Sequence, residues 1–169
     1  MSDLCDILSR ADIERDLDEF IRNNSSVTSF PSLTNCKRKQ AWGGLFAVVK
    51  SNPSVSIKEK ALISCRLLSR DSTGINECIE NTHVELLIET LMCSDNAGVS
   101  FEAKKVLSNL IHQSGIVRAY CTQNGFLEKV LNLVKNHKET PLLENCHIGL
   151  QLDIFSNRDI KLWSGGLIL

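Results

Sequence analysis

The sequence is short of features that several classes of protein require. Aromatic residues make up 5% of its 169 residues, and it contains only three prolines. No apolar run approaches the roughly eighteen residues that a membrane-spanning helix needs, and the acidic start of the chain does not resemble a signal peptide. Nineteen basic residues stand against twenty acidic ones. Such a balanced chain has no overall attraction for polyanions, so we expect neither nucleic-acid binding nor a transmembrane segment.

Patterns typical of catalytic and metal sites are also missing. The seven cysteines contain no pair two to four residues apart, the spacing that zinc sites use, and they suggest reduced thiols in a cytosolic protein. The four histidines have no partner at helical spacing suited to a metal. No nucleophile elbow, zinc-protease motif or phosphate-binding loop occurs. We therefore expect no cofactor, no metal and no enzymatic activity that depends on covalent or metal chemistry.

What the sequence does contain is helical periodicity. Over residues 100–114 apolar side chains recur every three or four positions, which predicts one buried helix face. Ser100 is the expected N-cap and Gly115 the expected helix end. No stretch alternates with a period of two, so we expect an all-α fold. The apolar positions of this helix are Ala103, Val106, Leu107, Leu110 and Ile111.

This pattern is repeated along the chain. Ala61, Ser64, Cys65 and Leu68 have the spacing of Ala103, Val106, Leu107 and Leu110, offset by 42 residues. The preceding helix, residues 83–93, recurs with an offset of 43 residues at 126–136. Periods of this length, carried by groups of helices, are typical of armadillo and HEAT solenoids. The order of a short, a medium and a long helix favours the armadillo type.

We therefore predict one armadillo-type domain of about three to four repeats, forming a fragment of a right-handed superhelix. Ser56 and Glu59 form an expected capping box at the start of helix 57–70. Acidic residues of the N-terminal helices should form a solvated outer face. The C-terminal end carries apolar residues with no following repeat, so we expect self-association there. The predicted segments are the capping helices 1–22, the repeats 36–70, 74–114 and 115–157, and an irregular apolar tail, 158–169.

Two blocks of residues resemble a particular family. They are Arg66-Leu-Leu-Ser-Arg-Asp71 and Glu102-Ala-Lys-Lys-Val-Leu-Ser-Asn109-Leu. Together they resemble the N-terminal armadillo repeats of synembryns, the resistance-to-inhibitors-of-cholinesterase proteins, over residues 40–141. The resemblance implies a guanine-nucleotide exchange factor and folding chaperone for heterotrimeric G-protein α subunits. It also implies a cytoplasmic protein that reaches the cell cortex or the inner face of the plasma membrane through its partner, here present as an N-terminal part from a truncated isoform or incomplete gene model.

Exchange of this kind, as the resemblance implies, needs no catalytic side chain, because tighter binding of the nucleotide-free α subunit drives nucleotide release. The amide of Asn109 suits a peptide backbone, or alternatively bonds within its own repeat. Arg70 and Asp71 alternatively tie a turn together. A generic armadillo-repeat adaptor that binds an unrelated peptide or protein is the competing hypothesis. The candidate partner-binding or inter-repeat polar residues are Arg66, Arg70, Asp71, Lys105 and Asn109.

Overall fold

The computed structural model describes residues 12–51 and 54–126, and all regular structure within these ranges is helical. This confirms the predicted helical class for that part of the chain. The first eleven residues of the predicted capping helices 1–22, and the predicted segments after residue 126 including the apolar tail 158–169, lie outside the described residues. The helices are α2 (Ile13–Asn24), α3 (Asn35–Ser51), α4 (Val55–Leu68), α5 (Ile75–Cys78), α6 (Asn81–Cys93), α7 (Ala97–Gln113) and α8 (Gly115–Gln123).

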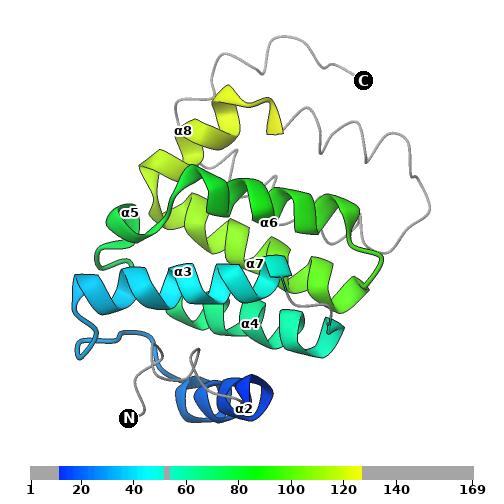
Figure 1. The fold of residues 1–169 in the computed structure, drawn as a ribbon. Coiled ribbons are helices and arrows are strands. Elements are labelled where there is room, and N and C mark those ends of the chain that lie inside the picture. The colour runs from blue at the N-terminus through cyan, green and yellow to red at the C-terminus, as the bar shows by residue number, and fades with distance from the viewer. Residues whose placement is uncertain (1–11, 52–53, 127–169) are drawn as a thin grey trace.

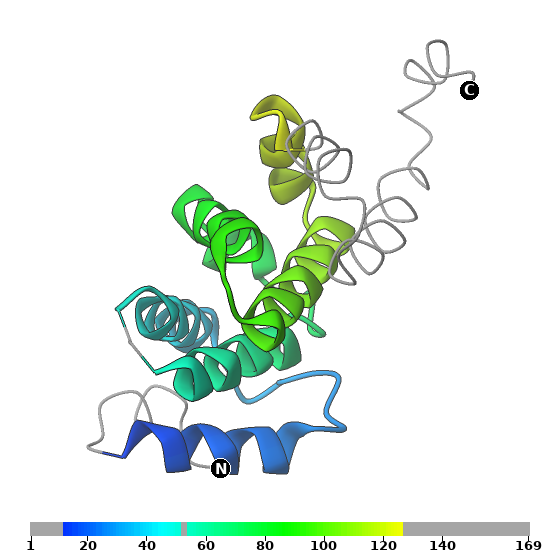
Figure 2. The same ribbon diagram turned by 90° about the vertical axis from the view of Figure 1, so that its right-hand side faces the viewer.

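The longer helices form two layers (Figures 1 and 2). Helices α3 and α6 lie in one layer, and α2, α4 and α7 follow one another in the second. Across the layers α3 packs on α4, and α6 packs on α7. The result is two stacked helical hairpins, α3–α4 and α6–α7. The short helix α5 links the two hairpins, and α8 follows the second one.

Equivalent positions of the long helices α4 and α7 are buried alike. On α4 the four apolar or small residues of the predicted repeat are at most 2% exposed, and on α7 their counterparts are fully buried. The periodicity therefore identified the buried face of both helices correctly. The residues are Ala61, Ser64, Cys65 and Leu68 on α4, and Ala103, Val106, Leu107 and Leu110 on α7.

A second correspondence joins the other two helices of the hairpins. Buried residues of α3 recur on α6 with the same offset of 42 residues, so both helices of a hairpin share one offset. The two helices also touch through a stacked pair, with the rings of Phe46 and His83 4.3 Å apart between centroids. The matched residues are Trp42, Leu45, Phe46 and Val49 on α3, and Val84, Leu87, partly buried Ile88 and Leu91 on α6.

The predicted helix starts were wrong by one turn or less. Helix α7 begins at Ala97, where the side chain of Asn96 accepts a hydrogen bond from Val99 N. Ser100 lies inside the helix, is fully buried, and donates from Oγ to Leu91 O at 3.0 Å. This hydroxyl is satisfied by the neighbouring helix α6 and therefore does not cap its own.

The starts of α4 and α8 require the same kind of correction. Ser54, rather than Ser56, caps α4 by accepting from Ile57 N. Gly115 is the first residue of α8 and not a left-handed helix end. Among the described residues, positive φ angles occur only at Gly74 and Gly125. At Gly74 a side chain would also meet Asn35 Oδ1 at 3.0 Å, so glycine is needed in this turn.

Helix α2 covers one side of α4 instead of presenting all its acids to solvent. Leu17 and Phe20 pack into the core. Glu14 and Asp18, half-exposed, both bind Lys60 of α4. The predicted solvated acidic face is wrong for Asp16, which is 2% exposed, whereas Glu14 and Asp18 bind this lysine with side chains that stay 44% and 45% exposed.

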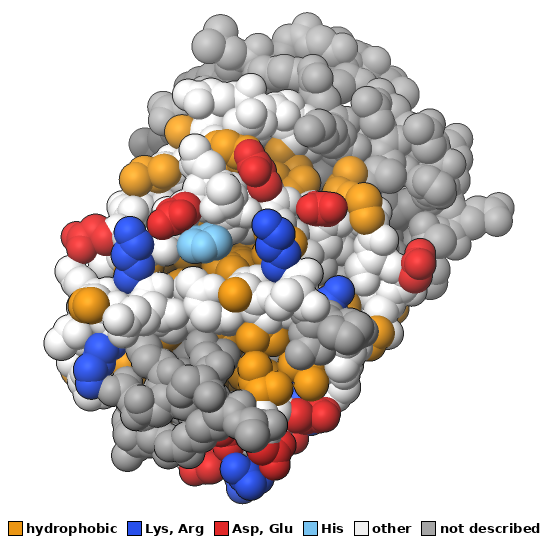
Figure 3. All heavy atoms as spheres, in the orientation of Figure 1, with side chains coloured by type: hydrophobic (Ala, Val, Ile, Leu, Met, Phe, Trp, Pro, Cys, Tyr) orange, Lys and Arg blue, Asp and Glu red, His pale blue; other side chains and the backbone are white. Residues whose placement is uncertain are grey.

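Helices of the described segments are too short or too polar to cross a membrane. On the face seen in Figure 3, Asp and Glu side chains gather at the α2 end of the molecule, whereas acidic and basic side chains are interspersed over α3 and α6. The charge of this chain is thus balanced in total but unevenly distributed over its helices.

Candidate functional site

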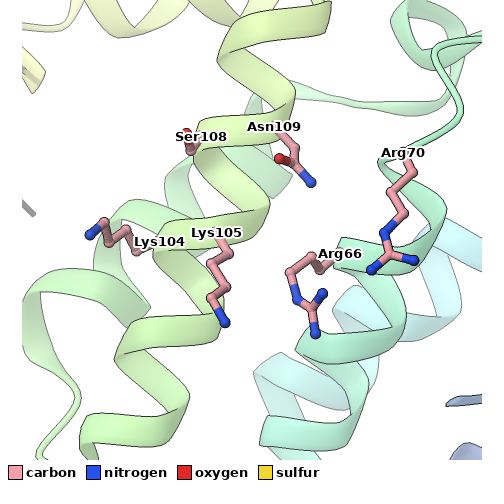
Figure 4. Close-up of a pocket in the computed structure, with 6 residues that line it drawn as sticks. All are labelled: Arg66, Arg70, Lys104, Lys105, Ser108 and Asn109. Atoms are coloured by element: carbon pink, nitrogen blue, oxygen red, sulfur yellow. The ribbon is translucent and has the colours of Figure 1, made fainter. Parts of the chain in front are cut away.

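A hollow of about 370 Å³ lies between the long helices α4 and α7 (Figure 4). It is open to solvent, and four of its six lining residues are cationic. Four of the five site residues predicted from sequence line it; Asp71 does not. The lining residues are Arg66, Arg70, Lys104, Lys105, Ser108 and Asn109.

Helical spacing on two neighbouring helices brings these side chains together. Arg66 and Arg70 are four residues apart at the end of α4 and in the turn that follows, and Lys105 and Asn109 are four apart on α7. Residues with this separation lie on one helix face. Because α4 packs beside α7, the two pairs converge. Figure 4 shows these four side chains directed into the space between the helices, while Lys104 points away from it.

One carboxylate partly neutralises the hollow. Glu102 is 7% exposed and accepts from Arg66 Nε at 2.7 Å through one oxygen and from Lys105 Nζ at 3.1 Å through the other. Lys105 Nζ also lies 4.0 Å from the ring centroid of Phe101, a cation–π contact. These contacts hold both cations in place, and with Arg70 three cationic side chains point into the hollow against this single acid. The hollow therefore keeps an excess of positive charge.

The amide of Asn109 forms a bond between helices. Its Nδ2 donates to Ser69 Oγ of the turn after α4 at 2.8 Å, and Ser69 Oγ in turn donates to Arg66 O at 2.8 Å. The interpretation in which Asn109 bonds only within its own repeat is therefore wrong, since its partner belongs to the preceding hairpin. The bond fixes the amide at the edge of the hollow, between the two helices that supply the cations.

Arg70 and Asp71, adjacent in sequence, have different surroundings. Arg70 reaches the hollow and also donates from Nη1 to Ser25 O at 2.6 Å. Asp71 is buried and accepts from Phe30 N at 2.7 Å and from Arg38 Nη2 at 2.9 Å. A role for Asp71 in direct contact with a partner is thus wrong. The alternative role, in which Asp71 ties the turn together, agrees with these contacts.

The hydrogen bonds of Asp71 set its charge state. Burial by itself raises the pKa of this carboxyl, but the hydrogen bonds from Phe30 N, Thr73 and Arg38 outweigh burial and lower the pKa to about 2. Asp71 is therefore ionised at neutral pH and forms a buried ion pair with Arg38, whose side chain is 6% exposed.

Sequence reasoning missed three residues around the hollow. Lys104 and Ser108 also line the hollow and are four residues apart on α7, as Lys105 and Asn109 are, so their spacing was a usable signal. Glu102 opens the second of the two residue blocks but is not among the predicted site residues. Its burial depends on Arg66 of another helix, which spacing within α7 does not indicate.

The chemistry of the described residues gives no sign of a metal or thiol site. Across the described ranges, no group of three or more His, Cys, Asp or Glu side chains could hold a metal ion. Burial raises the pKa of Cys65, and raises that of Cys121 to about 11. These two thiols are therefore protonated at neutral pH and poor nucleophiles. The hollow can bind through charge and hydrogen bonds.

Comparison with known proteins does not identify a relative. No protein-family model matches the chain, and no curated protein matches it.

Proposed function

We propose that this chain belongs to a right-handed armadillo-type solenoid that binds a protein partner through the basic hollow between α4 and α7. The offset of 42 residues shared by α3–α6 and α4–α7 supports a repeat of this length. The order of α5, α6 and α7, with 4, 13 and 17 residues, supports the armadillo type. Solenoids of this kind bind extended partners along the face that their successive helices form.

The partner that the sequence favours is a G-protein α subunit in its nucleotide-free form. Two features support this proposal: the synembryn-like blocks, and the fact that four of the five residues chosen from those blocks line one hollow. The excess of positive charge in the hollow fits an acidic segment on the partner. The single observation that carries the proposal is the convergence of Arg66, Arg70, Lys105 and Asn109 from two helices.

The proposed activity works by differential binding. A protein that binds the nucleotide-free α subunit more tightly than the nucleotide-bound one shifts the equilibrium toward release and protects the empty, less stable form. This requires a complementary surface and no proton transfer or nucleophile. The same complementarity supports a chaperone role. By this proposal the protein acts in the cytoplasm, and at the inner face of the plasma membrane when its partner is there.

Binding to purified α subunits tests the proposal. We expect the chain to bind an α subunit stripped of nucleotide and to bind the GDP-loaded form at least tenfold more weakly, a difference of about 1.4 kcal/mol. Titration calorimetry with both forms measures this difference, and release of a fluorescent nucleotide measures exchange. A chain that binds the two forms equally well, or neither, would contradict the proposal.

Variants of the hollow tell specific binding from general charge effects. Lys105→Gln and Arg66→Gln should each weaken binding of the nucleotide-free α subunit several-fold. Lys39→Gln is the matched control, because Lys39 is a cation with a 61% exposed side chain on α3, in the other layer. Equal losses for all three variants would mean that the hollow is not the contact surface. Binding of other proteins with no response to α subunits would instead favour the generic adaptor.

A further inference from the structure

We infer that the loop between α2 and α3, residues 25–34, is part of the binding site, because it holds Arg70 in the hollow and is itself fixed by the Arg38–Asp71 pair. Arg38 and Asp71 are then positioning residues for a site that neither of them lines. The inference rests on the proposed function for the use of the hollow. Its mechanical part, the control of Arg70 by the loop, can be tested without any partner.

Arg70 needs support from outside its own helix. It lies in the turn that follows the last residue of α4, where the regular helical bonds end. Its Nη1 donates to two carbonyls of the loop, Ser25 O at 2.6 Å and Val27 O at 3.4 Å. A free arginine side chain loses rotamer entropy when it is fixed. The loop fixes it before any ligand arrives, which lowers the cost of binding.

The loop is held in turn by a buried cluster around Phe30. The backbone N of Phe30 donates to Asp71 Oδ2, and its carbonyl accepts from Arg38 Nη2 at 2.8 Å. Arg38 Nε donates to Leu33 O at 3.2 Å, so one guanidinium binds two carbonyls of the loop and the Asp71 carboxylate. The ring of Phe30 is 1% exposed and stacks on Phe20 of α2. Both polar groups of the Phe30 backbone and its ring are therefore anchored.

The residue that anchors the loop and the residue that the loop holds are neighbours in the sequence, Asp71 and Arg70. Asp71 holds the loop at Phe30, and Arg70, the preceding residue, is held by the loop at Ser25 and Val27. Loosening the loop at Asp71 should thus release Arg70. Arg66 gives an internal comparison, because it is fixed independently by Glu102. A loss of loop anchoring should affect Arg70 and leave Arg66 unchanged.

The test is the reactivity of the two arginines toward phenylglyoxal, followed by peptide mass spectrometry. Asp71→Asn keeps the size of the side chain but replaces one acceptor oxygen with a donor group. We expect it to raise the rate of Arg70 modification several-fold with no change at Arg66. Arg38→Lys, which keeps the charge but loses the branched guanidinium, should act in the same way. Unchanged Arg70 reactivity in both variants, or a parallel rise at both arginines, would overturn the inference.

A double-mutant cycle with the nucleotide-free α subunit then connects the loop to binding. Asp71→Asn should weaken binding about fivefold in the native chain and have no further effect once Arg70 is replaced by alanine. An equal loss in the Arg70→Ala background would mean that Asp71 does not act through Arg70, and would also overturn the inference. If neither the native chain nor any variant binds an α subunit, the proposed function fails. The phenylglyoxal rates still decide whether the loop holds Arg70.

Discussion

Lys60 of α4 and Glu102 of α7 occupy equivalent positions, 42 residues apart, but carry opposite charges. Each lies at a boundary between neighbouring helices of the same layer. At the α2–α4 boundary Lys60 Nζ lies 2.9 Å from Glu14 Oε1 and 2.7 Å from Asp18 Oδ2. At the α4–α7 boundary Glu102 binds Arg66 and Lys105. One boundary has a cation between two acids, and the other has an acid between two cations.

The charges around each pair explain why only the second boundary is a candidate site. At the first boundary the hydrogen bonds that Lys60 donates to Asp18 and Glu14 raise the pKa of Lys60, and the Ser56 hydroxyl together with Lys60 lowers the pKa of Glu14. The lysine therefore attracts both acids. At the second boundary Arg70 adds a third cation, which Glu102 does not contact. Side-by-side packing of neighbouring helices thus gives a closed contact between α2 and α4 and a basic hollow between α4 and α7.

The largest expected effect comes from breaking the buried ion pair that fixes the loop after α2. Replacing one partner of a buried pair leaves the other charge without compensation, at a cost of roughly 3–5 kcal/mol. We expect Arg38→Ala to lower the free energy of unfolding by about that amount in urea titration. Lys39→Ala is the neighbouring control, since its ion pair with Glu80 is exposed and should contribute less than about 1 kcal/mol. Similar losses for both would mean that Asp71 finds another partner.

Next in size is the apolar packing at the α4–α7 boundary. Leu107 is fully buried, so Leu107→Ala should cost roughly 2–5 kcal/mol through lost burial and the cavity it leaves. Lys104→Ala, three residues away, should cost well under about 1 kcal/mol, as most surface changes do. Urea melts of the two variants measure this contrast. Equal effects would contradict the assignment of the buried face of α7.

The helices and their buried faces could be predicted from the sequence because both depend on local spacing. Leu107 and Cys65 lie on stripes that repeat every three or four residues, and these stripes are buried. Helix starts were less predictable, because several residues near each start can cap. Ser100 and Asn96 are both suitable N-caps, and the choice depended on Leu91 O, which takes the hydroxyl of Ser100.

The candidate site was predictable where residues lie on one helix face and unpredictable where they depend on distant segments. Arg66, Arg70, Lys105 and Asn109 follow helical spacing and converge. The burial of Asp71 depends on Arg38, 33 residues earlier, and on the path of the intervening loop. No pattern within the Arg66–Asp71 block indicates that partner, so the block alone could not distinguish a binding residue from a residue that anchors a loop.

Acid should lower the stability of the fold by protonating Asp71, which anchors the loop between α2 and α3. Its folded pKa of about 2 is below the ordinary value of 3.8, so its contribution to stability is complete above about pH 4 and is lost as the pH falls through 2. We expect the free energy of unfolding of the native chain to fall over this range more steeply than that of Asp71→Asn. Urea titrations at several pH values measure both slopes. Parallel slopes would show that other carboxyl groups account for the acid sensitivity.

The smallest expected effect tests the two boundaries against each other by removing the central charge of each. Lys60→Gln leaves Glu14 and Asp18 facing one another, and Glu102→Gln leaves Arg66 and Lys105 without their acid. Both changes create repulsion between like charges, so each variant should have a slightly lower melting temperature at low ionic strength. Because salt at about 0.5 M screens such repulsion over a few ångströms, most of each loss should disappear there.

Amide hydrogen exchange should locate the two effects at different boundaries. With Lys60→Gln we expect faster exchange in α2, which Lys60 ties to α4, and little change in α7. With Glu102→Gln the change should instead appear in α7, while α2 keeps its native rates. If Lys60→Gln left α2 unchanged, its docking would depend on Leu17 and Phe20 alone, and the ion pairs would not account for the closed boundary. If both variants changed both helices, the two boundaries would form one cooperative unit, and the difference between a closed contact and an open hollow would rest on the excess cations alone.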